Sequence, residues 1–202
     1  MAKAKVGIYG GTFNPPHVGH VKALESFSSA LTLDEIIVIP DFLPPHKEHD
    51  AVARAEDRLK MCELAFSHVK GAKVSDIEIK RGGKSYTYIT LSELSGEDRE
   101  LYLLVGTDMF LTLSKWVRSD IIFALATICL VRRESDAEIT EKIKCKISEY
   151  TEQLGARVIE IPHTVHESSS TEARVIDFQS KDAEALIPQG VLEYINEVGL
   201  YK

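Results

Sequence analysis

Short runs of apolar, mostly β-branched residues alternate along this chain with longer amphipathic stretches. This alternation constrains the fold more than any other feature, because strands that alternate with helices build a parallel sheet covered on both faces. The expected strands are Val6–Tyr9, Ile36–Ile39, Lys73–Ile79, Leu101–Val105, Ile128–Val131 and Arg157–Ile161. The expected helices are Val18–Leu31, Ala55–Val69, Thr87–Leu94 and Ile139–Leu154, followed by a helical C-terminal segment in which Pro188 suits a first helical turn.

The pattern therefore predicts an α/β fold with a doubly wound, mostly parallel, Rossmann-like sheet of about five to six strands and helices on both faces. The length of 202 residues corresponds to one domain over residues 1–202, whose helical C-terminal part covers about 168–202. In such sheets ligands bind at the carboxyl ends of the strands, near the switch in strand order. We therefore look for chemistry directly after each strand.

Charge and composition exclude several classes of protein. A net charge of −7 argues against bulk nucleic-acid binding, which needs a basic face. The three cysteines lie far apart and form no C-x-x-C pair, as is typical of free thiols in a reducing compartment. The longest apolar run, Ile121–Val131, is too short to span a membrane, and Met1–Gly11 lacks the apolar segment of a signal peptide. We expect a soluble, cytoplasmic protein without a membrane partner.

The first expected strand runs into an unusual segment, Gly10-Gly11-Thr12-Phe13-Asn14-Pro15-Pro16-His17-Val18-Gly19-His20. It matches neither the dinucleotide fingerprint nor the P-loop. His17 and His20 are three positions apart at the start of a helix and so share a face, where free N–H groups and the helix dipole favour an anion. This combination predicts a phosphate site. Two alternatives are ordinary polar residues at a helix start, or a metal pair for which Asp41 and His46 are conceivable further ligands.

The same segment resembles the signature of the H-x-G-H nucleotidyltransferase superfamily. Further blocks narrow the resemblance, and they are Pro44-Pro45-His46-Lys47, Ser85-Tyr86-Thr87, Gly106-Thr107-Asp108 with Trp116, and Ser169-Ser170-Thr171-Glu172-Ala173-Arg174. In this order they are similar to the blocks of the bacterial nicotinate mononucleotide adenylyltransferases, and the similarity spans the chain. Asn14 stands where that family commonly has aspartate, and Ser168 and Ala173 stand where isoleucine is more frequent.

This resemblance implies transfer of an adenylyl group from ATP to nicotinate mononucleotide, giving deamido-NAD and pyrophosphate. The attacking phosphate oxygen is already ionised, so catalysis needs positioning and charge stabilisation rather than a strong general base. Mg²⁺ is expected on the ATP phosphates, without a set of metal ligands in the protein. ATP and nicotinate mononucleotide are thus the expected partners, and the oligomeric state stays open, a homo-oligomer included.

The resemblance also implies roles for individual residues. His17, His20 and Arg174 are the expected catalytic residues, donating to the ATP phosphates and to charge that develops at the α-phosphorus. The expected ATP-binding residues are Gly10, Gly11, Thr12, Phe13, His17, His20, Ser169, Ser170, Thr171 and Arg174. The expected substrate-binding residues are Lys47, Tyr86, Thr87, Gly106, Asp108 and Trp116.

Five of these six substrate-binding residues have an ordinary structural alternative. The N–H groups of Tyr86 and Thr87 would receive the nicotinate carboxylate, or they simply begin a helix. Asp108 would bind ribose hydroxyls or the base, or it caps a helix. Trp116 would stack on the pyridine ring, or it is a core aromatic. Lys47 would be a second cation on the phosphates, or a solvated lysine.

Two rival functions remain at this point. One is a related transferase that accepts nicotinamide mononucleotide, or that uses CTP with a phosphorylated alcohol. The other is a nucleotide-sensing module that binds without turnover, against which the intact His17, His20 and Arg174 argue. Residues 42–53 are rich in proline and charge and are typical of a lid.

Overall fold

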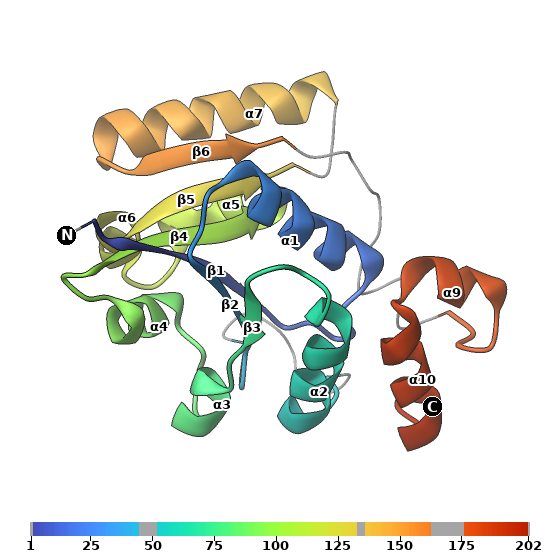
Figure 1. Ribbon diagram of the computed structural model, residues 1–202. Helices are drawn as coiled ribbons and strands as arrows, with labels where there is room; N and C mark the ends of the chain where they lie inside the picture. Colours follow the sequence, from blue (N-terminus) through green and yellow to red (C-terminus); the bar gives the residue numbers. More distant parts are fainter. Residues whose placement is uncertain (1, 45–51, 133–135, 163–175, 202) are drawn as a thin grey trace.

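A computed structural model describes residues 2–44, 52–132, 136–162 and 176–201. Within them lies one six-stranded sheet in the order β3-β2-β1-β4-β5-β6, in which every neighbouring pair is parallel (Figure 1). The strands are β1 (Ala4–Gly11), β2 (Glu35–Pro40), β3 (Ala72–Val74), β4 (Arg99–Gly106), β5 (Ala126–Val131) and β6 (Arg157–Ile161). The predicted fold class is confirmed.

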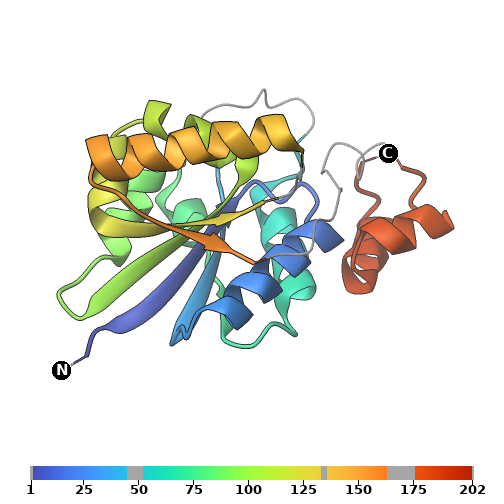
Figure 2. The same ribbon diagram turned by 90° about the horizontal axis from the view of Figure 1, so that it is seen from above.

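Helices cover both faces of this sheet and continue beyond its carboxyl edge. They are α1 (Val18–Ala30), α2 (Ala55–Phe66), α3 (Ile77–Arg81), α4 (Thr87–Leu94), α5 (Thr107–Thr112), α6 (Ser119–Leu125), α7 (Ala137–Ser148), α9 (Lys181–Leu186) and α10 (Gln189–Val198). A 3₁₀ turn, η1 (Leu113–Lys115), follows α5, and a π-helical turn, η2 (Glu149–Gln153), extends α7. Figure 2 shows α1 and α7 on opposite sides of the sheet.

The two faces of the sheet build two separate cores. Side chains of α1, α2, α9 and α10 pack together on one face, and those of α4, α5, α6 and α7 pack on the other. Alternation along β4 explains the division, because Leu103 and Val105 face the second core while Leu104 faces the first. Because α9 and α10 share the first core with α1 and α2, the C-terminal helices lie beside these two helices in Figure 1.

Strand order switches between β1 and β4, and there the sheet opens. The pairing of β1 with β4 extends to Ile8 and Leu103, whereas β1 continues beside β2 to Gly11 and β4 continues beside β5 to Gly106. The two central strands therefore diverge over their last residues. In doubly wound folds this divergence is where ligands bind, so the strand order alone points to Gly10, Gly11 and Gly106.

The expected strand over Lys73–Ile79 is wrong in its second half. β3 pairs only with β2 and ends at Val74, and Ile77–Arg81 form the short helix α3. Apolar Ile77 and Ile79 flank Glu78 in the sequence, a pattern that also suits a strand. Glu78 is instead buried and bonded to Thr90, and a helical turn places it there.

The other differences concern where elements begin and end. α2 ends at Phe66 rather than Val69, and α7 begins at Ala137, because the Asp136 carboxylate accepts the Ile139 N–H at 2.9 Å as an N-cap. Pro188 is the N-cap residue of α10, one position before the first turn in which we expected it.

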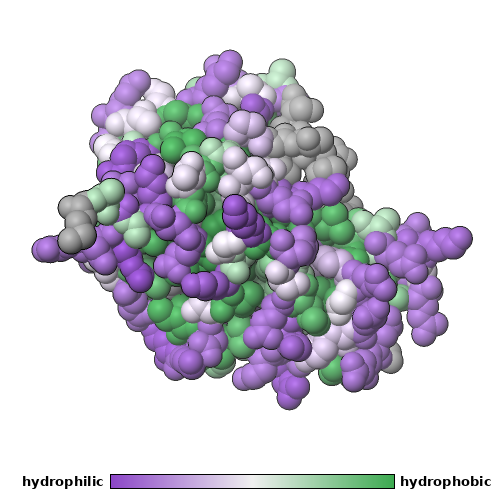
Figure 3. All heavy atoms as spheres, in the orientation of Figure 1, coloured by the Kyte–Doolittle hydropathy of each residue, from purple (hydrophilic) through white to green (hydrophobic). Residues whose placement is uncertain are grey.

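The surface is mostly hydrophilic on the face shown in Figure 3, with apolar atoms visible between polar side chains. In the part of the chain that the structure describes, every helix is too short or too polar to cross a lipid bilayer. Cys62 and Cys129 are buried free thiols, and Cys145 is an exposed one.

Candidate active site

The segment between β1 and α1 is buried and tightly folded. Thr12, Phe13, Asn14 and His17 are all nearly inaccessible to solvent, and the Asn14–Pro15 peptide bond is cis. Phe13 has a φ of 46°, in the left-handed region that non-glycine residues rarely adopt. Its ring packs edge-on against three neighbours, with centroid distances of 5.2 Å to Tyr9, 5.5 Å to Phe66 and 5.1 Å to His20. These contacts hold the loop in one conformation at the carboxyl end of β1.

The two histidine rings lie against each other at the start of α1, with their planes tilted by 36°. Their ring centroids lie 3.7 Å apart, and His17 is the N-cap residue of the helix. The His17 N–H donates to Nδ1 of His20 at 3.1 Å, so His20 closes a capping box. A backbone N–H can only donate, so Nδ1 of His20 is the acceptor and the neutral ring carries its proton on Nε2. In this tautomer the Nε2 atom of His20 is a donor, and it belongs to the first turn of a helix, the end that favours an anion.

Asp41, which we named as a conceivable metal ligand beside the histidine pair, is bonded to two other side chains. Its carboxylate accepts from Thr12 Oγ1 at 2.8 Å and from Arg58 Nη1 at 2.8 Å. Within the described ranges no group of three or more His, Cys, Asp or Glu side chains is placed to hold a metal ion, and His46 lies outside them.

Arg58 of α2 is a structural centre of this site that the sequence analysis missed. Its side chain is 1% exposed and donates to four oxygens that lie on three separate segments. These acceptors are the carbonyls of Thr12 at 2.9 Å, Phe42 at 3.2 Å and Ala53 at 3.0 Å, and the Asp41 carboxylate. Helical spacing held the signal, because Arg58 lies on the same face of α2 as the buried Met61, Cys62 and Ala65.

Asn14 stands where aspartate is common in the family, and the structure shows which bonds it makes there. Its Oδ1 accepts from the Ala53 N–H at 3.0 Å and from the Tyr201 hydroxyl at 2.6 Å. Both bonds need only an acceptor, which a carboxylate oxygen also provides. The departure from the family pattern therefore leaves these two contacts unchanged.

The Ser85-Tyr86-Thr87 block begins a helix, as expected. Tyr86 is the N-cap residue of α4 and Thr87 its first residue, but the Tyr86 N–H donates to the Lys84 carbonyl at 3.1 Å. The Thr87 N–H lies at the first helical position, where the helix itself offers no acceptor. Ser85 ties this start to the end of β2, because its Oγ accepts the Phe42 N–H at 2.9 Å and its N–H donates to the Leu43 carbonyl at 2.9 Å.

Glu78 of α3 lies buried beneath α4 and was also missed. It accepts a short hydrogen bond from the Thr90 hydroxyl, and Arg81 donates to the same hydroxyl at 3.0 Å. Burial raises the pKa of the Glu78 carboxyl above its ordinary value, although hydrogen bonds from Thr90 and Ser85 oppose that rise. This cluster fixes the start of α4 relative to β2.

The remaining expected residues follow β4. Gly106 is the N-cap residue of α5, so the alternative role of Asp108 as the cap is wrong, and Asp108 lies exposed in the first turn. Trp116 ends η1 and is partly buried against the second core, so it has at least the structural role that we weighed for it. Lys47, Ser169, Ser170, Thr171 and Arg174 lie outside the described residues, as do Ser168, Ala173 and most of the expected lid.

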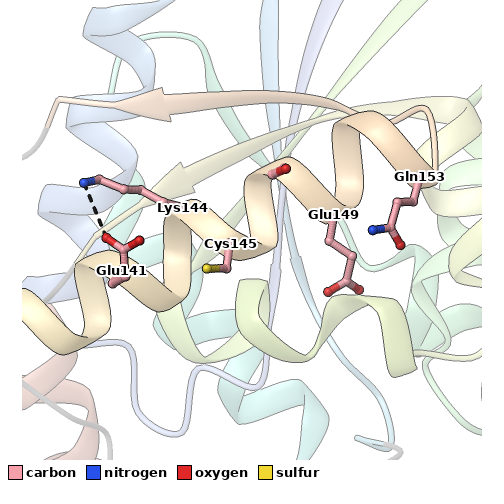
Figure 4. A pocket seen from close by; sticks show the side chains of 6 residues that line it. Glu141, Lys144, Cys145, Glu149 and Gln153 are labelled. Atoms are coloured by element: carbon pink, nitrogen blue, oxygen red, sulfur yellow. Dashed lines mark ion pairs between the residues drawn. The ribbon is translucent and has the colours of Figure 1, made fainter.

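A shallow hollow on α7 is separate from all of these residues. It has a volume of about 500 Å³ and is lined by Glu141, Lys144, Cys145, Ser148, Glu149 and Gln153 (Figure 4). Its acidic side chains are paired with lysines of the same segment, Glu141 with Lys144 at 3.6 Å and Glu149 with Lys146 at 2.6 Å. We therefore interpret this hollow as the solvated outer face of a helix, separate from the candidate site.

Comparison with known proteins defines the class. The family model described as cytidylyltransferase-like matches residues 8–176, so the chain is a nucleotidyltransferase of that family. A probable nicotinate-nucleotide adenylyltransferase of Desulfatibacillum aliphaticivorans is 34% identical over 98% of this chain and 99% of its own length. Its namesake from Geobacillus thermodenitrificans is 37% identical, over 98% of this chain and 86% of its own length. The chain belongs to the nicotinate-nucleotide adenylyltransferase family.

Solved structures share the fold. The nicotinic acid mononucleotide adenylyltransferase of Plasmodium falciparum, solved in complex with NaAD, superposes with a TM-score of 0.71 at 22% identity, covering 98% of this chain and 97% of that one. A putative nicotinate-nucleotide adenylyltransferase of Vibrio parahaemolyticus superposes with a TM-score of 0.64 at 20% identity, covering 96% and 99%.

Proposed function

We propose that this chain transfers the adenylyl group of ATP to nicotinate mononucleotide, producing deamido-NAD and pyrophosphate. The observation that carries the proposal is the orientation of His20. Its Nδ1 accepts the His17 N–H, so the neutral ring carries its proton on Nε2, and this ring lies at the start of α1, close to the end of β1. The names of the curated relatives and the NaAD complex of the Plasmodium protein support the same choice of substrates.

The reaction joins two anions and needs little proton chemistry. An oxygen of the mononucleotide phosphate attacks the α-phosphorus of ATP, a new P–O bond forms, and the bond to the β-phosphate breaks with pyrophosphate leaving. ATP enters as its magnesium complex, so Mg²⁺ is part of the substrate. His20 donates to the phosphates and to the negative charge that grows during transfer. We assign the same role to His17 and Arg174, and ATP binding to Gly10, Gly11, Thr12, Phe13, Ser169, Ser170 and Thr171.

The acceptor is proposed to bind on the β4 side of the divergence between β1 and β4. There Gly106 and Asp108 would meet the ribose or the base, and Trp116 the pyridine ring. The nicotinate carboxylate is assigned to the N–H of Thr87, because the N–H of Tyr86 already donates to Lys84. A helix start that receives a carboxylate would favour the acid over the amide, which carries no charge. Lys47 is proposed as a further cation on the phosphates.

Pyrophosphate release tests this proposal. MgATP is supplied with nicotinate mononucleotide, with nicotinamide mononucleotide or with neither, and a parallel series contains CTP. We expect release with ATP and the acid, and much less with the amide. Equal rates with both acceptors would keep the adenylyl transfer but remove the carboxylate site at Thr87. Binding of ATP without release in any arm would favour the nucleotide-sensing module, and release with CTP alone would favour a cytidylyltransferase.

A further inference from the structure

The segment after α10 returns toward the loop that carries the histidines. Gly199 ends the helix with a φ of 74°, and the N–H groups of Gly199 and Leu200 both donate to the Ile195 carbonyl, at 2.9 and 3.1 Å. Tyr201 follows with a φ of 62°, a conformation that a non-glycine residue keeps only when its surroundings hold it. Its ring stacks on Phe178 with centroids 5.7 Å apart. The hydroxyl of Tyr201 thereby reaches Oδ1 of Asn14 at 2.6 Å.

Asn14 is a junction of three distant parts of the sequence. It is 3% exposed and precedes His17 by three positions in the loop between β1 and α1. Its Oδ1 accepts from Tyr201, which lies 187 positions away, and from the N–H of Ala53, 39 positions away. A buried oxygen with two donors is held more firmly than one with a single donor, and what holds Asn14 also holds the loop that continues to His17.

We propose that Tyr201 is a positioning residue of the nucleotide site, and that it acts through the side-chain oxygen of Asn14. This inference rests on the proposed function. The Tyr201 hydroxyl fixes Asn14, Asn14 fixes the loop, and the loop sets the place of His17 and His20 relative to the phosphates. Small displacements of catalytic groups lower turnover strongly, so the loss of one distant hydroxyl lowers kcat.

A second tyrosine provides a control that distinguishes positioning of the histidine loop from simple attachment of the C-terminal helices to the fold. Tyr194 of α10 donates its hydroxyl to Asp57 of α2 at 2.9 Å. That bond also ties the C-terminal helices to the rest of the fold, but its partner belongs to α2 and not to the histidine loop. Tyr194→Phe is therefore the matched control for Tyr201→Phe, since each variant removes one hydroxyl and keeps the ring.

The test is a double-mutant cycle read by kcat, by KM for each substrate and by the thermal midpoint. We expect Tyr201→Phe to lower kcat by about three- to tenfold, the usual range for one lost hydrogen bond. Tyr194→Phe should shift the thermal midpoint about as much as Tyr201→Phe does, but it should leave kcat near the wild-type value. In an Asn14→Leu background, which has no acceptor, Tyr201→Phe adds no further loss. In an Asn14→Asp background, where a carboxylate oxygen accepts, the loss returns.

Three results would overturn the inference. They are an unchanged kcat in Tyr201→Phe, equal losses of kcat in the two tyrosine variants, and additive losses from Tyr201→Phe and Asn14→Leu. Wild-type turnover reports on the proposed function separately. If the wild type binds MgATP without turnover, the same cycle is measured on MgATP affinity by calorimetry. If it neither binds nor reacts, both proposals fail together.

Discussion

His20 uses its two ring nitrogens for different tasks. Nδ1 accepts the His17 N–H and completes the cap of α1, and Nε2, which carries the proton, is the donor that we propose for the phosphates. Sequence spacing could predict that the two histidines share a face, because helical geometry fixes the neighbours of each position. It could not predict which nitrogen carries the proton, because that depends on a backbone contact that only the folded loop makes.

Substitution of His20 separates these tasks. We predict that His20→Ala lowers turnover by about 10²- to 10³-fold, the usual cost of removing one donor to a developing negative charge. His20→Gln, which suits the same position of a capping box, is expected to keep the thermal stability of the wild type and still lose turnover. Pyrophosphate release and thermal melts measure the two effects. Turnover near the wild-type level in either variant would contradict the assignment.

Alanine substitutions at the neighbouring Gly10 and Gly11 form a matched pair of variants. A Cβ added at Gly10 would meet nothing within 4 Å, whereas one at Gly11 would lie 3.0 Å from the ring of Phe13. We predict that Gly10→Ala keeps the free energy of unfolding within about 0.5 kcal/mol but raises KM for MgATP by about tenfold, because the methyl group enters the space assigned to the nucleotide.

Gly11→Ala should instead lower the free energy of unfolding by about 1–3 kcal/mol through overpacking against Phe13. Urea denaturation and initial rates distinguish the two variants. An unchanged KM in Gly10→Ala would remove that glycine from the ATP site.

At the scale of elements, α2 fixes the site through one buried cation. Arg58 donates to Thr12, Asp41, Phe42 and Ala53, and so joins the histidine loop to both flanks of residues 45–51. We predict that Arg58→Met costs about 3–5 kcal/mol in the free energy of unfolding, because the Asp41 carboxylate then stays buried without its guanidinium. The exposed Lys60 on the same helix, paired with Glu63 at 3.3 Å, is the control, and Lys60→Met should cost about 1 kcal/mol or less. Equal losses in urea denaturation would contradict the role of Arg58.

The α3–α4 pair carries a pH-dependent component of stability. Burial raises the pKa of the Glu78 carboxyl above its ordinary value of 4.5. At pH values between 4.5 and the raised pKa, this carboxyl binds its proton more tightly in the folded chain than in the unfolded chain. The contribution of Glu78 is therefore most favourable below pH 4.5 and falls as the pH rises through the raised pKa. We predict that the difference in unfolding free energy, wild type minus Glu78→Gln, decreases over this window in urea denaturation. A difference that is flat or increases with pH would contradict the burial of a titrating carboxyl.

Sequence patterns predicted helices and strands well where a single periodicity of apolar residues dominated the segment. Thr87–Leu94 matched its helix, and the strands of the central sheet matched within about two residues, a usual margin for boundaries. The second half of Lys73–Ile79 failed because an edge segment with alternating residues satisfies the strand pattern, while the buried contact of Glu78 with Thr90 favours a helical turn. Such a contact joins two segments of the chain and leaves no local signal.

For the whole molecule, the sequence could predict a parallel sheet but not the order of its strands. The order decides that β1 and β4 diverge beside Gly11 and Gly106, and this divergence gives the histidine pair and the residues after β4 a common edge. The bond between Tyr201 and Asn14, across 187 positions, is a property of the same scale. It depends on how α10 packs on α2 and could not be derived from either segment alone.

The fate of the ATP phosphates tests the central claim most directly. ATP labelled at the α-phosphate and, separately, at the γ-phosphate is incubated with Mg²⁺, nicotinate mononucleotide and the chain, and the products are separated. We predict that the α-label appears in a dinucleotide with the mass of deamido-NAD and the γ-label in an equal amount of pyrophosphate. Transfer of the γ-label to the mononucleotide, or recovery of both labels in unreacted ATP, would contradict adenylyl transfer as the function of this site.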